Sequence, residues 1–201
     1  MTDNLIVNIV VEGNLDEAVL KKLLASVGIE VAYVYGKRGK DHIRGNIKRY
    51  NQAATHERWV VLVDLNNDAE CPPPFIASWL PTRNPNLQLR IAVRAVEAWL
   101  LAERNGMARF LSVSEQRLPI NPEDEEKPKT TLINIARRSK SKAIRTDIVP
   151  KDGSTAIQGP GHTTCLIEFA MKYWNPERAA SNAPSLKRSI NSLLQWKVGK
   201  R

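Results

Sequence analysis

The chain has 201 residues, of which 42% are hydrophobic, enough for one sizeable core and too many for a globally disordered protein. Its formal charge is +9, and most of the excess lies in residues 101–201, with 18 basic and 10 acidic residues against 12 and 11 in residues 1–100. The two cysteines exclude a disulfide framework and no apolar run is long enough to span a membrane, so we expect a cytoplasmic protein with a polyanionic partner.

Predicted strands and helices alternate over the first 95 residues. Apolar runs rich in Val, Ile and Leu predict strands over residues 5–11, 29–35, 59–65 and 87–93. Helical spacing of apolar residues predicts helices over 15–27 and 41–54, and a short helix over 75–80 after Pro72, Pro73 and Pro74 stop the chain. This alternation predicts an α/β, Rossmann-like fold, a mainly parallel four-stranded sheet with helices on both faces.

The pattern becomes helical after residue 95. Apolar periodicity predicts helices over residues 95–105, 130–138, 162–174 and 184–196. Prolines and an acidic run predict a solvated loop over 119–128, and glycines and prolines predict an irregular loop over 146–161. We therefore expect an α/β domain over residues 1–106 and a mostly helical, basic extension over residues 107–201 packed on it.

Acidic residues follow three of the four predicted strands. They are Glu12, Asp16, Glu17, Asp64, Asp68 and Glu97. Because the carboxyl ends of parallel strands share one edge of a sheet, we expect these side chains to converge there. Crowded carboxylates repel one another unless a cation is present, and oxygen-only ligands suit Mg²⁺ or Mn²⁺. The alternative is that individual acids among them only cap helix N-termini.

Two segments resemble the motifs of the Toprim domain. One is Val11-Glu12-Gly13 followed by Asp16-Glu17, and the other is the run from Val61 to Asp68 that contains Asp64. The Toprim domain occurs in topoisomerases, primases and OLD-family nucleases. The likeness covers about residues 4–97, and it is closest to the OLD type and to small stand-alone Toprim-like proteins.

The resemblance implies a Mg²⁺- or Mn²⁺-dependent nuclease. It implies that Glu12 is a general acid/base or metal ligand and that Asp64 holds the metal directly. It also implies that Asp16 or Glu17 serves a second metal and that Glu97 is the acid of the later strand. The chain departs from the Asp-x-Asp pattern of the second motif because Asn66 stands at the second position, and we expect Asp68 to substitute for the missing carboxylate.

The resemblance also bears on partners. OLD-type nucleases often work with an ATPase in defence against phage. Because the chain lacks a GxxxxGK[ST] motif, the ATPase implied here is a separate protein of the AAA or ABC type. We expect nucleic acid as a partner, with DNA favoured over RNA, and no association with a membrane. The sequence leaves open whether the protein forms an oligomer. Two alternatives remain: a catalytically degenerate Toprim-like module that binds nucleic acid or a protein, and a phosphatase or phosphotransferase acting on small phosphate esters.

Two clusters of basic residues are candidates for phosphate contacts. The first contains Lys37, Arg38, Lys40 and Arg44, and the second contains Arg137, Arg138, Lys140 and Lys142. Contacts of this kind depend on salt and do not distinguish base sequences. The alternative is an ordinary solvated surface. For His162, which follows a Gly-Pro-Gly segment, we expect a satisfied surface or capping histidine rather than a residue that activates water.

Overall fold

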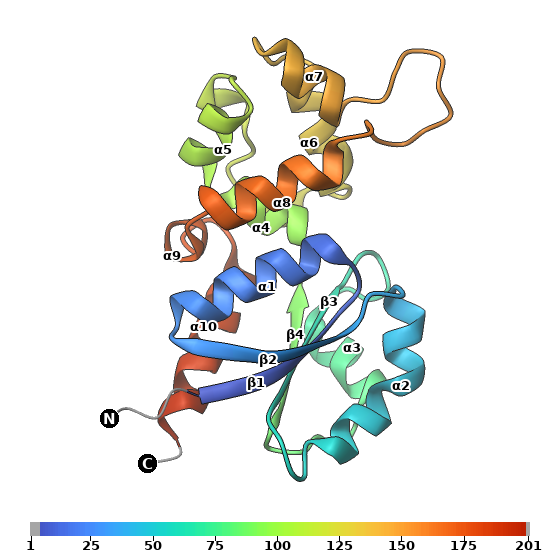
Figure 1. Ribbon diagram of the computed structural model, residues 1–201, viewed down its shortest axis with the longest axis vertical. Coiled ribbons are helices and arrows are strands. Elements are labelled where there is room, and N and C mark those ends of the chain that lie inside the picture. The colour runs from blue at the N-terminus through green and yellow to red at the C-terminus, as the bar shows by residue number, and fades with distance from the viewer. Residues whose placement is uncertain (1–4, 200–201) are drawn as a thin grey trace.

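The computed structural model describes residues 5–199 and contains a four-stranded parallel sheet, which lies in the lower half of the view in Figure 1. The strands are β1 (Leu5–Val11), β2 (Ile29–Gly36), β3 (Trp59–Asp64) and β4 (Leu87–Ala92). Their order is β2-β1-β3-β4, and every neighbouring pair is parallel. The predicted α/β, Rossmann-like fold is confirmed. Since β1 and β3 are neighbours, the order brings the acids after these two strands side by side.

Helices cover both faces of the sheet. Strand side chains alternate between the two faces. Val7, Ile9 and Leu62 join one apolar cluster with α1 (Asn14–Ser26), and alternate residues such as Val61 join a second cluster on the opposite face. The helices of that second cluster are α2 (Lys40–Ala53) and α3 (Pro72–Trp79). The prediction that the three prolines stop the chain is wrong, because proline suits the first turn of a helix, where no backbone N–H is needed.

The elements after β4 are all helical, and those from residue 107 onward make up the predicted extension. They are α4 (Val96–Ala102), α5 (Arg104–Phe110), the 3₁₀ turns η1 (Glu115–Arg117) and η2 (Pro122–Asp124), α6 (Pro128–Ala136), α7 (Lys142–Ile148), α8 (His162–Lys172), α9 (Pro176–Ala179) and α10 (Pro184–Val198). The predicted helix over 95–105 is interrupted at Glu103, whose buried carboxylate accepts a hydrogen bond from Arg178 at 2.9 Å. The sequence did not predict α7, which is capped by Ser141 and includes the first residues of the predicted loop over 146–161.

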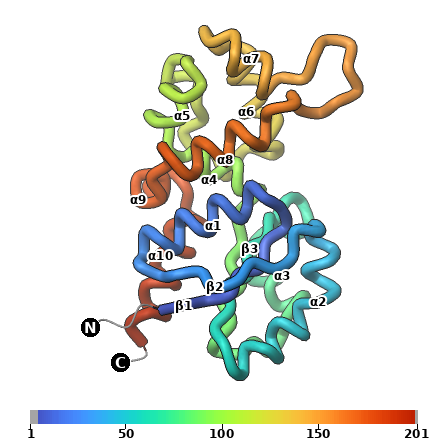
Figure 2. The backbone as a smooth tube through the Cα atoms, viewed as in Figure 1, coloured from blue at the N-terminus to red at the C-terminus, as the bar shows by residue number. Residues whose placement is uncertain are grey.

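The apolar core is continuous between the sheet and the extension. The cluster that contains α1 also contains buried residues of α4, α6, α8 and α10. Figure 2 shows α10 returning to the sheet, where it packs against β4, and Trp196 Nε1 donates to the Pro85 carbonyl at 3.0 Å. A boundary between residues 106 and 107 would fall inside α5, so the division into two domains stays a prediction. Within residues 5–199 no helix has the length and apolar character needed to cross a membrane.

A buried polar network joins the extension to the segment that follows β4. Ser185, at the start of α10, accepts hydrogen bonds from Trp99 Nε1 at 2.7 Å and from the Val93 amide at 3.2 Å. Its hydroxyl donates to Glu123 Oε1 at 2.6 Å, and the same carboxylate accepts the Ser185 amide. The prediction of a solvated loop over 119–128 is therefore wrong for Glu123, which caps a helix 62 residues further along the chain.

Candidate active site at the carboxyl edge of the sheet

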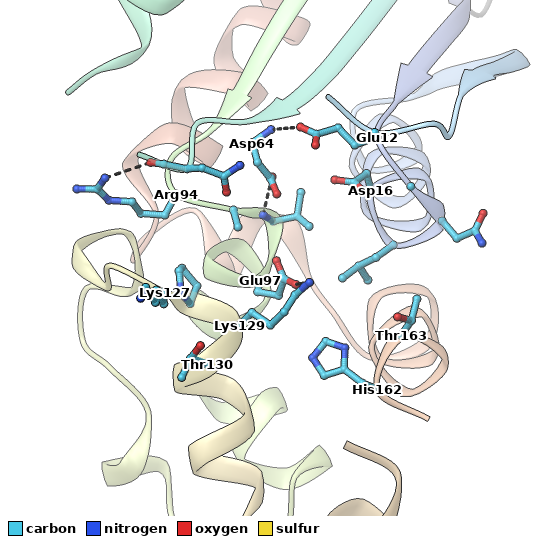
Figure 3. Close-up of a pocket in the computed structure, with 18 of the residues that line it drawn as sticks. Glu12, Asp16, Asp64, Arg94, Glu97, Lys127, Lys129, Thr130, His162 and Thr163 are labelled. Carbon is cyan, nitrogen blue, oxygen red and sulfur yellow. Dashed lines mark hydrogen bonds and ion pairs between the residues drawn. The ribbon is translucent and has the colours of Figure 1, made fainter. Parts of the chain in front are cut away.

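Four of the predicted acids line one cleft of about 630 Å³ at the carboxyl edge of the sheet (Figure 3). Glu12 follows β1, Asp64 ends β3, and Glu97 and Asp16 lie in the first turns of α4 and α1. Asp16 and Glu97 are buried, with 8% and 3% of their surface exposed. The expectation that these four side chains converge is confirmed by their shared cleft.

Backbone amides fix the orientation of two of these carboxylates. Glu12 Oε1 accepts the Asp64 amide at 2.8 Å, and Asp64 Oδ1 accepts the Val96 amide at 3.0 Å. Asp64 therefore satisfies the N-terminal turn of α4, as the capping alternative expects. The same bonds link the end of β1, the end of β3 and the start of α4 into one rigid frame.

Burial and mutual repulsion raise the pKa of these carboxyl groups. Desolvation, followed by the charges of Asp16, Glu97 and Glu12, holds the pKa of Asp64 well above its usual value. Desolvation and the charge of Glu12 raise the pKa of Asp16 to about 7. The pKa of Glu12 is also raised by burial, although the hydrogen bond from the Asp64 amide and the charge of Lys40 oppose the shift. Without a cation, these carboxyl groups therefore keep their protons to a higher pH than usual, and a bound cation would favour their ionised form.

The extension supplies the opposite wall of the cleft. Lys127, Lys129 and Thr130 come from the start of α6, and His162 and Thr163 come from the start of α8 (Figure 3). Lys129 Nζ lies 3.4 Å from Glu97 Oε1. Among residues 5–199, it is the only cation that forms an ion pair with a carboxyl group of the cleft. The sequence did not single out Lys129, because only the packing of α6 beside α4 brings it to the site.

His162 differs from its prediction as a surface or capping residue. Only 1% of its surface is exposed, and neither ring nitrogen has a hydrogen-bond partner among the described residues. Desolvation and the nearby charge of Lys129 lower its pKa to about 4, so the ring is neutral at neutral pH. The Gly-Pro-Gly segment before it was the sequence signal for a special position.

The other two predicted metal ligands lie outside the lining of the cleft. Glu17 forms ion pairs with Lys21 at 2.6 Å and Lys37 at 2.5 Å. Partial burial alone would raise the pKa of Glu17, but the hydrogen bonds from these two lysines outweigh it and lower the pKa. Asp68 forms an ion pair with Lys40 at 2.7 Å. Both carboxylates are thus already neutralised by neighbouring lysines.

Asn66 takes part in the cleft through its backbone and its amide. Its φ of 50° lies in the left-handed region, which asparagine and aspartate adopt more readily than most residues. With its amide oriented to satisfy both atoms, its oxygen accepts from Lys40 Nζ at 2.9 Å and its nitrogen donates to the Arg94 carbonyl at 3.2 Å. The position predicted to carry a second motif acid therefore carries a neutral hydrogen-bonding group.

The donor set of the cleft suits a hard divalent cation, since it offers carboxyl and amide oxygens, and a cation would take the place of the protons that the raised pKa values favour. As they stand, no three His, Cys, Asp or Glu side chains within residues 5–199 are grouped closely enough to hold a metal ion. Glu12 and Asp64 would have to share their oxygens between the backbone amides and a cation. The residues therefore fit the charge of such an ion, while a complete ligand shell would need side-chain movement or water.

The predicted basic residues divide into paired and unpaired groups. Lys37 and Lys40 are engaged by Glu17 and Asp68, and Arg137 lies 3.9 Å from Asp152. The other predicted contacts are exposed side chains for which the described residues show no ion pair, namely Arg38, Arg44, Arg138, Lys140 and Lys142. Their role in binding nucleic acid stays a prediction.

Comparison with known proteins gives no assignment. No protein-family model, curated protein or solved structure matches this chain.

Proposed function

We propose that the protein is a metal-dependent nuclease whose active site is the cleft lined by Glu12, Asp16, Asp64 and Glu97. The observation that carries the proposal is the concentration of these four carboxyl groups, from the ends of β1 and β3 and the first turns of α1 and α4, in one cleft. Among the described residues, only Lys129 forms an ion pair with any of them. Like charges that share a buried site cost free energy unless a cation relieves them. The resemblance of the surrounding segments to Toprim motifs supports the same reading.

The side chains of the cleft would have different roles in the proposed reaction. Glu12 and Asp64 are held by backbone amides, so they would present fixed oxygens to a cation. A divalent cation bound there would stabilise the negative charge that develops on a phosphodiester during attack by water. Lys129, beside Glu97, would bind a phosphate oxygen and hold the backbone at the carboxylates. Water would form the new bond to phosphorus as the bond to the leaving oxygen breaks, and one of its protons would end on that oxygen.

The partners follow the same proposal. The net charge of +9 favours a polyanionic substrate, and we propose DNA in preference to RNA. A separate AAA- or ABC-type ATPase and a role in defence against phage are proposed from the motif resemblance alone.

A second candidate is a Toprim-like module that binds nucleic acid or a protein without catalysis. Two observations favour it. Asn66 removes one motif carboxylate, and Asp64 already has a structural partner in the Val96 amide. In that case the acids of the cleft would have a structural role: they would hold α4 and the neighbouring loop in place and would not bind a metal ion.

The deciding experiment compares wild-type protein with Asp64→Asn, which keeps the shape and the hydrogen-bond acceptor but removes the charge. Supercoiled plasmid, linear DNA, RNA and a small phosphodiester would each be incubated with Mg²⁺, Mn²⁺ or a chelator. Asp124→Asn is the matched control, because Asp124 is exposed and lies outside the cleft.

We expect metal-dependent cleavage of DNA that falls at least about 100-fold in Asp64→Asn and is unchanged in the control. Cleavage that survives equally in Asp64→Asn would contradict the proposal. Hydrolysis of small esters without cleavage of polynucleotides would favour the phosphatase class instead. Binding of DNA without any hydrolysis would favour the second candidate.

A further inference from the structure

A second concave surface lies on the extension, away from the carboxylates. Two adjoining hollows of about 370 Å³ and 450 Å³ share Arg117 and Arg138 in their linings. Together they form a groove between α5, η1 and the C-terminal end of α6. The cations that line the groove are Arg109, Arg117, Arg138 and Lys140, and no aspartate or glutamate is among its lining residues.

The chain builds this groove by joining two segments that are distant in sequence. The Lys140 amide donates to the Ser112 carbonyl at 3.1 Å, which ties the loop after α6 to the loop after α5. Ser112 has a φ of 52°, a left-handed conformation that reverses the chain at the junction. This reversal sets Arg109 and Arg117 around the same hollow as Arg138 and Lys140. The sequence predicted two members of this set but not the two arginines from α5 and η1.

The cations of the groove differ from their neighbours in having no acidic partner. Arg104 lies 3.8 Å from Glu115, and Arg137 lies 3.9 Å from Asp152. By contrast, the described residues show no ion pair to any of the four groove cations, and all four are exposed. Uncompensated like charges around one concavity raise the local positive potential and attract anions.

The groove is connected to the carboxylate cleft through one helix. Pro128, Lys129 and Thr130 of α6 line the cleft, whereas Thr131, Asn134 and Ile135 of the same helix line the groove. A nine-residue helix is only about 13 Å long. A chain of phosphates therefore needs to cross little more than the length of α6 to touch both sites.

We infer that this groove binds the phosphodiester backbone of the nucleic acid whose scissile bond occupies the cleft; the inference rests on the proposed function. Arginine forks bind phosphate oxygens in pairs, and the serine hydroxyls at 112 and 114 add neutral donors. No aromatic side chain lines the groove, so it offers no stacking platform for bases. Binding through this surface is therefore insensitive to base sequence.

The test measures the affinity of the full chain for fluorescently labelled 30-base-pair DNA duplexes of two unrelated sequences, by anisotropy in the presence of a chelator. The groove variant is Arg117→Gln with Arg138→Gln. The control variant is Arg83→Gln with Lys187→Gln, which removes the same charge from exposed positions outside the groove. Thermal melting of each variant checks that the fold is kept.

We expect the groove variant to bind both duplexes at least about tenfold more weakly and to lower the slope of log affinity against log salt by about 1.5, since each lost phosphate contact removes about 0.7–0.9. The control should bind within about twofold of wild type, as expected for cations that make no phosphate contact. An equal loss in both variants, or none in the groove variant, would overturn the inference. Because a chelator prevents metal-dependent cleavage, this result is independent of whether the nuclease proposal succeeds.

A cleavage assay adds the link between the two sites. With Mg²⁺ or Mn²⁺, the groove variant should lose activity on long DNA but keep wild-type activity on a small phosphodiester, which cannot reach from the cleft to the groove. Equal losses on both substrates would overturn the proposed continuity between groove and cleft.

Discussion

The network around Ser185 and the cleft around Asp64 both contain buried polar groups, but the two sites differ in how many of these groups have a hydrogen-bond or ion-pair partner. Every polar group that meets at Ser185 has a partner: Trp99 Nε1 and the Val93 amide donate to it, and Glu123 accepts from it. At the cleft, several carboxylates face one another and Lys129 is in contact with Glu97 alone. A fully paired network specifies the position of a helix, whereas carboxyl groups that lack enough cationic partners leave a place for a ligand.

This difference predicts opposite effects on stability. Replacing Ser185 with Ala removes the acceptor of two donors and the donor to Glu123, and should lower the free energy of unfolding by about 3 kcal/mol. Ser192→Ala on the same helix is the control, because its single hydrogen bond to Gln88 is long, at 3.3 Å. Urea unfolding measures both. A loss in Ser185→Ala no larger than in the control would show that the network does not hold α10.

Removing a carboxylate from the cleft should have the reverse effect. Asp64→Asn keeps the oxygen that accepts the Val96 amide and removes a carboxyl group whose ionisation the folded chain opposes, because its pKa is raised. In a chelator at pH 8 we expect the variant to gain about 1–2 kcal/mol in the free energy of unfolding. Asp124→Asn should change it by less than about 0.5 kcal/mol. A destabilised Asp64→Asn would mean that the charge itself holds the fold, and the contrast with Ser185 would fail.

The burial of His162 makes the stability of the fold depend on pH in the acidic range. Its pKa is lowered to about 4 in the folded chain, so between about pH 6.5 and pH 4 the unfolded chain takes up a proton that the folded chain does not. Above about pH 6.5 the histidine is neutral in both states and has no effect on the pH dependence. As the pH falls from about 6.5 toward 4, its protonation in the unfolded chain lowers the free energy of unfolding by about 1–3 kcal/mol.

The matching variant is His162→Leu, which cannot take up this proton. Because the carboxylates titrate in both proteins, the difference in unfolding free energy between wild type and variant isolates the histidine. That difference should shift in favour of the variant as the pH is lowered. A difference that stays constant from pH 7 to pH 4 would contradict the assignment of a buried, neutral imidazole.

Asn66→Asp should change the affinity for metal rather than the stability of the fold. Aspartate tolerates the left-handed backbone at this position, and the change restores the Asp-x-Asp spacing beside Asp64. An added carboxylate should raise Mn²⁺ affinity about tenfold, or about 1.4 kcal/mol. Asn67→Asp adds the same charge at the next exposed residue of the cleft rim and serves as the comparison. Equal gains in both variants would show that charge alone, and not the motif position, sets the affinity.

The acidic half of the cleft could be predicted because it depends on local patterns and one topological rule. Apolar runs locate β1, β3 and β4, and parallel strands bring their carboxyl ends to one edge. Glu12, Asp64 and Glu97 follow from these two steps. Glu17 and Asp68 satisfy the same rule, but Lys37 and Lys40 pair with them, and these lysines are distant in sequence from their partners. Only Lys21, four residues after Glu17 on the same helix, is a partner that helical spacing identifies among the described ion pairs.

The other wall of the cleft could not be predicted because it depends on how the extension packs. Lys129 and His162 belong to α6 and α8, which pack against α4 and α1. The break at Glu103 and the cap supplied by Glu123 have the same origin, since their partners Arg178 and Ser185 lie 75 and 62 residues away along the chain. Periodicity reports which residues share a face, but not which distant helix will cover it.

The most direct test of the account is the calorimetric titration of wild-type protein, Asp64→Asn and Asp124→Asn with Mn²⁺ at pH 8. We expect binding by the wild type, affinity at least about tenfold lower in Asp64→Asn, and affinity within about twofold of wild type in Asp124→Asn. Absence of binding by the wild type, or equal binding by Asp64→Asn, would contradict the claim that the carboxylates of the cleft form a metal site.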